Sequence, residues 1–204
     1  RRENNWNQVC NGGFVLGALA IADREPDLAA RIIKKSLSSI ALGLKPYAPD
    51  GIYPEGYSYW SYGTWYQVLM IEALRSALGD SFGLEKSVGF LQSAYFMNFM
   101  VAPSGRLFNF SDCGAGSSVQ SNLLLAWFAS ELNDMGVIYR DSEVLKQGKF
   151  RVGERRFAPL ALFYLSQCDF ENITPIKDSF WYGNGDQPLF VYRSGWRRKD
   201  DTYL

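Results

Sequence analysis

The chain has 204 residues, 47% of them apolar, which is enough for one domain with a sizeable core. Its 21 basic and 21 acidic residues cancel, which argues against a nucleic-acid-binding protein that works through overall positive charge and leaves room for a local basic patch. The chain has no His, so proton transfer near neutral pH must use carboxylate, Tyr, Lys or Cys groups, or a His supplied from elsewhere.

Apolar patterns predict a series of helices. The small apolar run over residues 12–22 is typical of a helix buried on all sides. Apolar residues at helical spacing over 28–44, after Pro26 and an acidic residue, predict an amphipathic helix. Further helices are expected over 62–78, 84–100 and 119–132, the last capped by Ser117 or Ser118, and one or two more within 140–167.

The composition changes near Asp169. Turn-forming residues come first, and "PLFVYRSGW" then predicts a strand with Phe190 and Tyr192 on one side, followed by a turn and a new extended run over 202–204. We therefore expect a mainly α fold, with helix pairs over residues 1–168 and a linker and β piece over 169–204. The short and long links alternate, which favours an array of helical hairpins with the most apolar helices inside.

The cysteines, the apolar runs and the first residues bear on metal sites, membrane spans and chain length. Three Cys residues lie far apart without a spacing typical of a zinc site, so we expect three buried free thiols and no metal or cofactor within this chain. No apolar run is long enough to span a membrane. The first residues, "RRENNWNQVCNGG", contain neither an initiator Met nor a signal peptide, and are interpreted as internal to a longer protein.

The segment over residues 46–67 contains six of the twelve Tyr and two of the six Trp, interrupted by Pro and Gly. Aromatic rings stack on the apolar faces of sugars, and Tyr adds a hydroxyl group. A cleft lined by these rings would suit a carbohydrate chain. The alternative is that many of them fill gaps between helix ends. The rings concerned are Tyr57, Tyr59, Trp60, Tyr62 and Trp65.

Two polar stretches add to this hypothesis. The amides of "NNWNQ", residues 4–8, need hydrogen-bond partners if they are buried, so they either bind a polar substrate or its carboxylate, or cap and close the following helix. Asp112 lies in the Gly-rich stretch "FNFSDCGAG", where it either contacts sugar hydroxyls or makes a turn.

The stretches "NNWNQVCNGG", "YAPDGIYPEGYSYWSYGTWYQVLMIEAL", "GRLFNFSD" and "PLFVYRSGW" resemble, in this order, the heparinase II/III-like family of polysaccharide lyases. The resemblance covers nearly the whole chain. It implies the second half of an incomplete α/α toroid over residues 1–168, then the first strands of an antiparallel β-sandwich. It also implies an acidic polysaccharide or oligosaccharide as partner, with no nucleic acid and no membrane, and a periplasmic or secreted bacterial location.

Such lyases cleave uronic-acid polysaccharides by β-elimination, in which the C5 proton is removed and the glycosidic oxygen at C4 leaves. The resemblance implies that Asn5 neutralises the substrate carboxylate and that Tyr62 transfers protons, with Tyr59 and Tyr66 as near alternatives. The implied substrate-binding residues are Trp6, Gln8, Glu55, Tyr57, Tyr59, Trp60 and Asp112.

Trp6 stands where many members of the family have a His, and other members use a His from the β domain, beyond Leu204. Either Tyr62 acts as both base and acid, or another part of the protein supplies the base, and we expect this chain alone to be inactive. Two other classes stay open. One is an α/α-toroid glycoside hydrolase that uses two carboxylates, such as Glu55 and Asp112, about 6.5–9.5 Å apart if inverting. The other is a non-catalytic glycan-binding protein.

Overall fold

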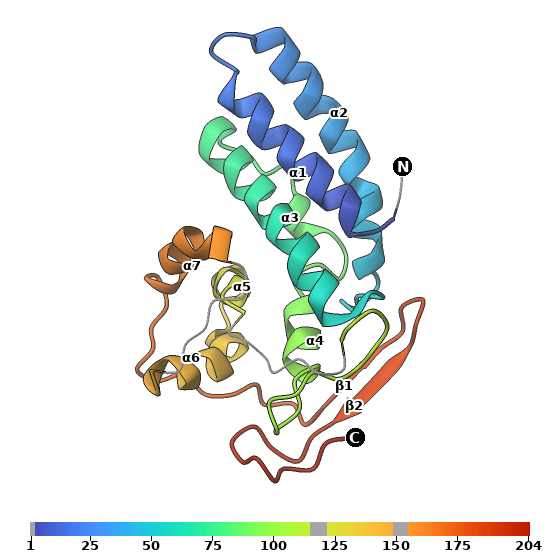
Figure 1. Ribbon diagram of the computed structural model, residues 1–204, viewed down its shortest axis with the longest axis vertical. Helices are drawn as coiled ribbons and strands as arrows, with labels where there is room; N and C mark the ends of the chain where they lie inside the picture. Colours follow the sequence, from blue (N-terminus) through green and yellow to red (C-terminus); the bar gives the residue numbers. More distant parts are fainter. Residues whose placement is uncertain (1–2, 115–121, 149–154) are drawn as a thin grey trace.

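The computed structural model describes residues 3–114, 122–148 and 155–204. This part of the chain is mainly helical, with seven α-helices and a small two-stranded antiparallel sheet near its C-terminal end (Figure 1). The mainly α fold class expected from the sequence is therefore confirmed. Before Asp169 the described residues contain one isolated β-bridge, between Val101 and Leu107, and no sheet.

Three long helices form one end of the molecule: α1 (Asn5–Ala20), α2 (Pro26–Leu44) and α3 (Gly56–Leu78). In Figure 1, α1 lies between α2 and α3. The amphipathic helix predicted over residues 28–44 is confirmed as α2, which begins with Pro26 and has Asp27 in its first turn. The predicted starts of the other two were wrong, because α1 begins seven residues before Gly12 and α3 six residues before Tyr62.

Two glycines let α1 and α3 approach each other closely. A Cβ atom on Gly12 would lie 2.7 Å from the carbonyl oxygen of Tyr66, and one on Gly63 would lie 2.5 Å from Oε1 of Gln8 and 2.8 Å from Cβ of Asn5. Residues 5 and 8 thus face residue 63, and residue 12 faces residue 66. The residue numbers of these facing positions rise together along both helices, so α1 and α3 run parallel. Helix α2 returns in the opposite direction (Figure 1).

The middle of the chain differs most from the sequence prediction. The helix expected over residues 84–100 is present only as the short 3-10 turn η2 (Leu84–Lys86) and the helix α4 (Ser93–Phe99). Gly89 interrupts it with a φ of 76°, and a Cβ atom there would collide with the carbonyl group of Tyr47. The expected helix over 119–132 is described as α5 (Leu124–Leu132), and its expected cap, Ser117 or Ser118, lies outside the described residues.

Later elements complete the body. The helices expected within residues 140–167 are α6 (Tyr139–Lys146) and α7 (Ala158–Leu165), preceded by the short turns η3 (Met135–Ile138) and η4 (Arg155–Phe157). A further 3-10 turn, η1 (Lys45–Tyr47), follows α2. Of the thiols, Cys113 is buried as expected, Cys168 is half-buried, and Cys10 is exposed, which corrects the prediction of three buried thiols.

The sheet pairs β1 (Phe180–Gly183) with β2 (Leu189–Tyr192). The strand predicted in "PLFVYRSGW" is confirmed as β2, and the extended run over 202–204 joins it through hydrogen bonds between Tyr192 and Leu204. Strand β1 was not predicted, because turn-forming residues surround it. Trp181 anchors the sheet to α4, with its ring centroid 4.9 Å from that of Phe96.

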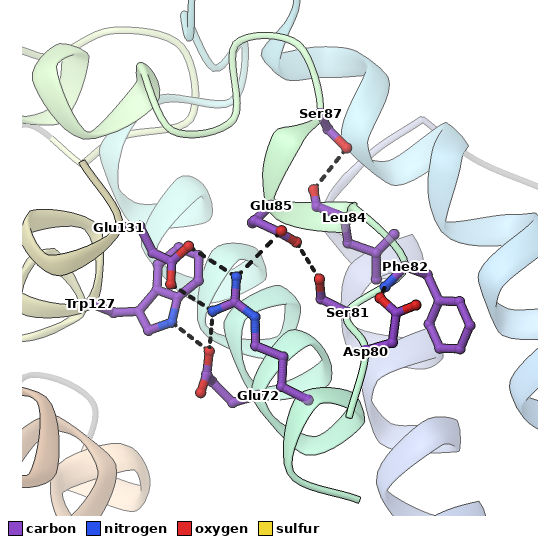
Figure 2. A network of polar contacts seen from close by, with 10 residues as sticks. Glu72, Asp80, Ser81, Phe82, Leu84, Glu85, Ser87, Trp127 and Glu131 are labelled. Atoms are coloured by element: carbon purple, nitrogen blue, oxygen red, sulfur yellow. Dashed lines mark hydrogen bonds and ion pairs between the residues drawn. The ribbon is translucent and has the colours of Figure 1, made fainter. Parts of the chain in front are cut away.

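An ion-pair network ties α3 to α5 and to η2 (Figure 2). The Arg75 guanidinium group donates to both carboxylate oxygens of Glu131, at 2.6 and 3.0 Å, and to Oε1 of Glu72 at 2.9 Å. Glu85 lies 3.5 Å away. The indole N–H of Trp127, which is buried in the aromatic core, also donates to Glu72 at 2.9 Å. Helices α3 and α5 and the turn η2 are thereby fixed around one cation.

Candidate functional site

The first turns of α1 and α3 bring two of the predicted residues into one cluster. Asn5, the first residue of α1, is 1% exposed. Its Nδ2 atom donates to Oε2 of Glu55 at 2.9 Å, and its backbone N–H group donates to the same oxygen at 3.3 Å. Its Oδ1 atom is buried and has no hydrogen-bond partner among the described residues. Glu55 therefore orients the carboxamide group of Asn5.

Further buried hydroxyl groups extend this contact. Tyr53 donates to Oε2 of Glu55 at 3.2 Å and lies 3.5 Å from Oε1 of Gln8. Gln8 in turn donates to the hydroxyl oxygen of Tyr47 at 2.8 Å, and that oxygen lies 2.7 Å from Oγ1 of Thr64. The amides of α1 are thus fixed within the protein by partners on η1, α3 and the loop before α3. N-capping does not explain them, because Asn4 makes no side-chain cap hydrogen bond.

Three buried tyrosines of the segment over residues 46–67, Tyr47, Tyr53 and Tyr57, have raised pKa values. Burial raises the pKa of Tyr47 and Tyr53 well above the usual range, and it raises the pKa of Tyr57 to about 12. In each case the low-dielectric surroundings disfavour the phenolate form.

Tyr62 lies closer to solvent than these tyrosines. It lies in the second turn of α3, directly before Gly63, and its side chain is half-buried. Its ring packs edge-on against the ring of Tyr66, with centroids 5.5 Å apart. The guanidinium carbon of Arg156, from η4, lies 6.0 Å from the centroid of the Tyr62 ring. Arg156 also donates to the hydroxyl oxygen of Tyr66 at 3.1 Å.

Gly63 links the two groups through the chain, because it packs against Asn5 of α1 and directly follows Tyr62 in α3. A Cβ atom on Gly63 would be 3.2 Å from Cα of Asn5, so the backbones of α1 and α3 meet there. An amide held by a carboxylate and a half-buried phenol beside a cation therefore occur at neighbouring positions on adjacent helices. The carboxamide group donates to a carboxylate here, that of Glu55, and the phenol carries a proton that can be donated.

The other predicted site residues divide into two groups. Trp60 is fully buried, and its indole N–H donates to Oγ of Ser93 at 2.9 Å. Gln8 is fully buried too, and Tyr57 is 8% exposed. These side chains fill the space between helix ends, which was the alternative interpretation of the aromatic segment, and none of them presents an accessible ring or amide to a ligand in this structure. Trp65 is likewise buried and stacks on Phe157.

Trp6, Tyr59 and Asp112 are accessible. Tyr59 is 40% exposed on α3, one turn before Tyr62. Trp6 is 57% exposed, but it lines a cavity of about 580 Å³ between α1 and α2, on a different side of α1 from the Asn5–Glu55 pair. Asp112 is exposed in a loop that packs against the start of α3.

Sequence reasoning missed Arg156, Tyr53 and Tyr47. Arg156 follows Tyr66 by 90 positions in the chain, and nothing in "GERRF" indicates that one of its arginines lies over an aromatic ring. Tyr47 and Tyr53 belong to the aromatic segment, but their role in holding the amides could not be separated from packing.

No family model matches this chain, and no curated protein matches it significantly in sequence. The described residues contain no group of three or more His, Cys, Asp or Glu side chains that could hold a metal ion. None of the described helices combines the length and hydrophobicity that a membrane span requires.

Proposed function

We propose that this protein is a polysaccharide lyase that cleaves a uronic-acid-containing glycan by β-elimination. The observation that supports the proposal is the packing of Asn5, which is bound to Glu55, against Gly63, the residue that follows Tyr62 in α3. Nδ2 of Asn5 carries two hydrogens, one of which is donated to Glu55 in this structure, and both can be donated to a substrate carboxylate once Glu55 moves aside. Neutralising that carboxylate makes the adjacent C5 proton easier to remove.

In the proposed reaction a base takes the C5 proton, the C4–O bond breaks, a C4=C5 double bond forms, and Tyr62 gives its proton to the leaving oxygen. As an acid, Tyr62 needs no change of pKa. As a base it needs its pKa lowered from about 10 towards 7, which corresponds to about 4 kcal/mol. We favour a syn elimination by Tyr62 alone, because Arg156 brings a positive charge to this ring, its guanidinium carbon lying 6.0 Å from the ring centroid. A base from another part of the protein is the alternative.

In this structure Glu55 occupies the hydrogen-bond donors of Asn5 that the proposal assigns to the substrate. Two donors of Asn5 and the hydroxyl group of Tyr53 converge on one oxygen of Glu55, and Asn5 is almost fully buried. We infer that a uronate reaches the carboxamide of Asn5 when the half-buried side chain of Glu55 moves aside. Substrate binding then exchanges one carboxylate partner of Asn5 for another.

The fold proposal goes with the function. We propose that α1 and α3 are inner helices and α2 an outer helix of an incomplete α/α toroid, and that β1 and β2 begin a β-sandwich domain. The parallel course of α1 and α3, with α2 antiparallel beside them, supports this arrangement. The proposed partner is an acidic polysaccharide, and the proposed location is the bacterial periplasm or the cell exterior.

The nature of the product tests the function. The full-length protein is incubated with a panel of uronic-acid polymers, including heparan-like and alginate-like chains, while ultraviolet absorbance and reducing ends are followed together. Elimination raises both signals, because the new C4=C5 double bond absorbs in the ultraviolet. Reducing ends without absorbance would show a hydrolase, and binding without either signal would show a non-catalytic glycan-binding protein; both contradict the proposal.

A further inference from the structure

A polar cavity lies away from the Asn5–Glu55 pair. It is formed by the turn over residues 101–105, helix α6 and the segment that follows β2. Its volume is about 230 Å³. None of its lining residues belongs to the candidate site described above. Its described lining includes the cationic side chains of Arg140, Arg193, Arg197, Arg198 and Lys199.

Arg193 is the fixed centre of this cavity. Its side chain is 5% exposed. Its Nε atom donates to the carbonyl oxygen of Gly195 at 2.8 Å, and Nη1 donates to the carbonyl oxygen of Val101 at 3.4 Å. The guanidinium carbon lies 3.6 Å from the centroid of the Trp196 ring, which is itself held by a hydrogen bond to the carbonyl oxygen of Asp178. The guanidinium group is thus held in one orientation before any ligand binds.

This cation is buried with neutral partners. The hydrogen bonds of Arg193 within the described residues go to backbone carbonyls, and an aromatic ring covers one face. Burial lowers the pKa of Arg193 to about 10, against the opposing influence of Tyr203 and Asp201. A buried charge is costly unless a counter-charge accompanies it. An anion in the cavity would provide that counter-charge.

The remaining charges around the cavity also favour an anion. Glu143 is the one carboxylate among the described lining residues, and it is bridged to Lys146 at 3.1 Å. Arg198 is bridged to Asp200 at 2.6 Å. Arg197 and Lys199 are exposed at the rim. The lining residues therefore carry an excess of positive charge although the whole chain has a net charge of zero.

We propose that this cavity binds a single oxyanion, such as a sulfate, phosphate or carboxylate group, through Arg193 and the cations at its rim. Arginine presents planar N–H donors that match the oxygens of such groups. The volume is below the range of about 300 to 1,000 Å³ that is typical of pockets for whole small-molecule ligands, so it suits one acidic group better than a sugar ring. The proposal does not depend on the lyase reaction.

Calorimetric titration with sodium sulfate, at an ionic strength held constant with sodium chloride, tests it. We expect saturable binding by the unmodified protein and at least tenfold weaker binding by Arg193→Gln. The Arg197→Gln/Lys199→Gln double variant, which changes exposed residues only, should also bind more weakly, and it decides the outcome if Arg193→Gln does not fold. Arg24→Gln, an exposed arginine in the loop between α1 and α2, is the matched control and should bind as the unmodified protein does.

The source of the oxyanion is distinguished by the ligand titrated. Tighter binding of a sulfated or uronate-containing disaccharide than of inorganic sulfate or phosphate would show that the cavity takes an acidic group attached to a glycan. Equal or tighter binding of the inorganic ions would show that it takes a free ion. Either result supports an oxyanion site. No saturable binding of any of these probes, or equal binding by the control and the two cavity variants, would overturn the proposal.

Discussion

Asn5 and Glu55 lie 50 positions apart in the chain, yet the backbone N–H group and the side-chain amide of Asn5 both donate to one carboxylate oxygen of Glu55. This pair fixes the first residue of α1 to the loop that begins α3. It also sets the orientation of a carboxamide group that is otherwise enclosed by protein. The position of the candidate site therefore depends on a contact between two polar side chains rather than on the aromatic rings around it.

The Glu55→Gln substitution should destabilise the protein. The amide oxygen of the introduced side chain can still accept hydrogen bonds, but the negative charge is lost, and bonds to charged acceptors are the stronger ones. Because Glu55 is half-buried, we expect a loss of about 1–2 kcal/mol in the free energy of unfolding, measured by urea denaturation. Glu171→Gln, at an exposed position, is the control. Equal stability of the two variants would show that the Asn5–Glu55 contact is not a stabilising one.

Replacing Gly63 by Ala tests the close approach of α1 and α3. The helix propensity of alanine is more favourable than that of glycine by about 1 kcal/mol. However, the Cβ atom of alanine would lie less than 3 Å from atoms of Gln8 and Asn5. We expect the steric overlap to outweigh the gain in helix propensity, so that the free energy of unfolding falls by about 1–3 kcal/mol. At Gly17, also helical, a Cβ atom meets nothing within 4 Å, so Gly17→Ala should instead stabilise the protein by about 0.5–1 kcal/mol. Changes of the same sign at both positions would contradict the packing described here.

Removing the cation of the ion-pair network should have a pH-dependent effect. Burial alone would raise the pKa of Glu85, but the hydrogen bonds from Ser81 and from its own backbone N–H group, together with the charge of Arg75, outweigh burial and lower this pKa below its usual value. A lowered folded-state pKa gives stability that is present above the pKa of the unfolded chain, about 4.3, and that is lost as the pH falls. Arg75→Met leaves three carboxylates without their cation.

We expect Arg75→Met to lose about 1–3 kcal/mol at pH 7, a value reduced from that of fully buried pairs because these side chains are partly exposed. The difference from the unmodified protein should shrink as the pH falls below about 4.3, because Glu85 then loses the charge that Arg75 stabilises. Denaturation curves above and below this pH give the measurement, with Arg24→Met as the control. A difference that stays constant with pH would refute the electrostatic explanation.

Some elements could be predicted from the sequence because the cause is local. The helix α2 has a regular apolar period and Pro26 at its start, and β2 is a short run of apolar and aromatic residues, LFVY, that follows turn-forming residues. Other elements depend on distant contacts. The helix expected from Leu84 is broken at Gly89, where the backbone of Tyr47 packs too closely for a side chain. No local pattern reports such a contact.

The same limit applies to the candidate site. The roles of Asn5 and Tyr62 rest on a resemblance in sequence and stay predictions. The contact of Asn5 with Gly63, and the position of Arg156 beside Tyr62, come from the packing of segments far apart in the chain. Burial separated the aromatic residues in a way that composition could not, because Trp60 and Tyr59 are adjacent in sequence and have opposite environments.

The most direct test of the lyase proposal is the kcat of Tyr62→Phe in the full-length protein, on a polymer that the unmodified protein cleaves. The change removes one oxygen and keeps the ring, so packing against Tyr66 and substrate binding should persist. A positioned acid or base contributes about 100- to 10,000-fold to the rate, and we expect kcat to fall by that amount. Asn5→Ala should also slow turnover, because the substrate carboxylate loses its partner.

Tyr59→Phe and Tyr66→Phe, measured beside Tyr62→Phe, make the result decisive. The account predicts that Tyr62→Phe loses elimination while both neighbours keep most of their kcat. Loss of activity in Tyr59→Phe or Tyr66→Phe instead would move the proton-transfer role to that residue. Full activity of all three variants would contradict the proposed mechanism, because the tyrosines of α3 would then serve packing and sugar stacking alone.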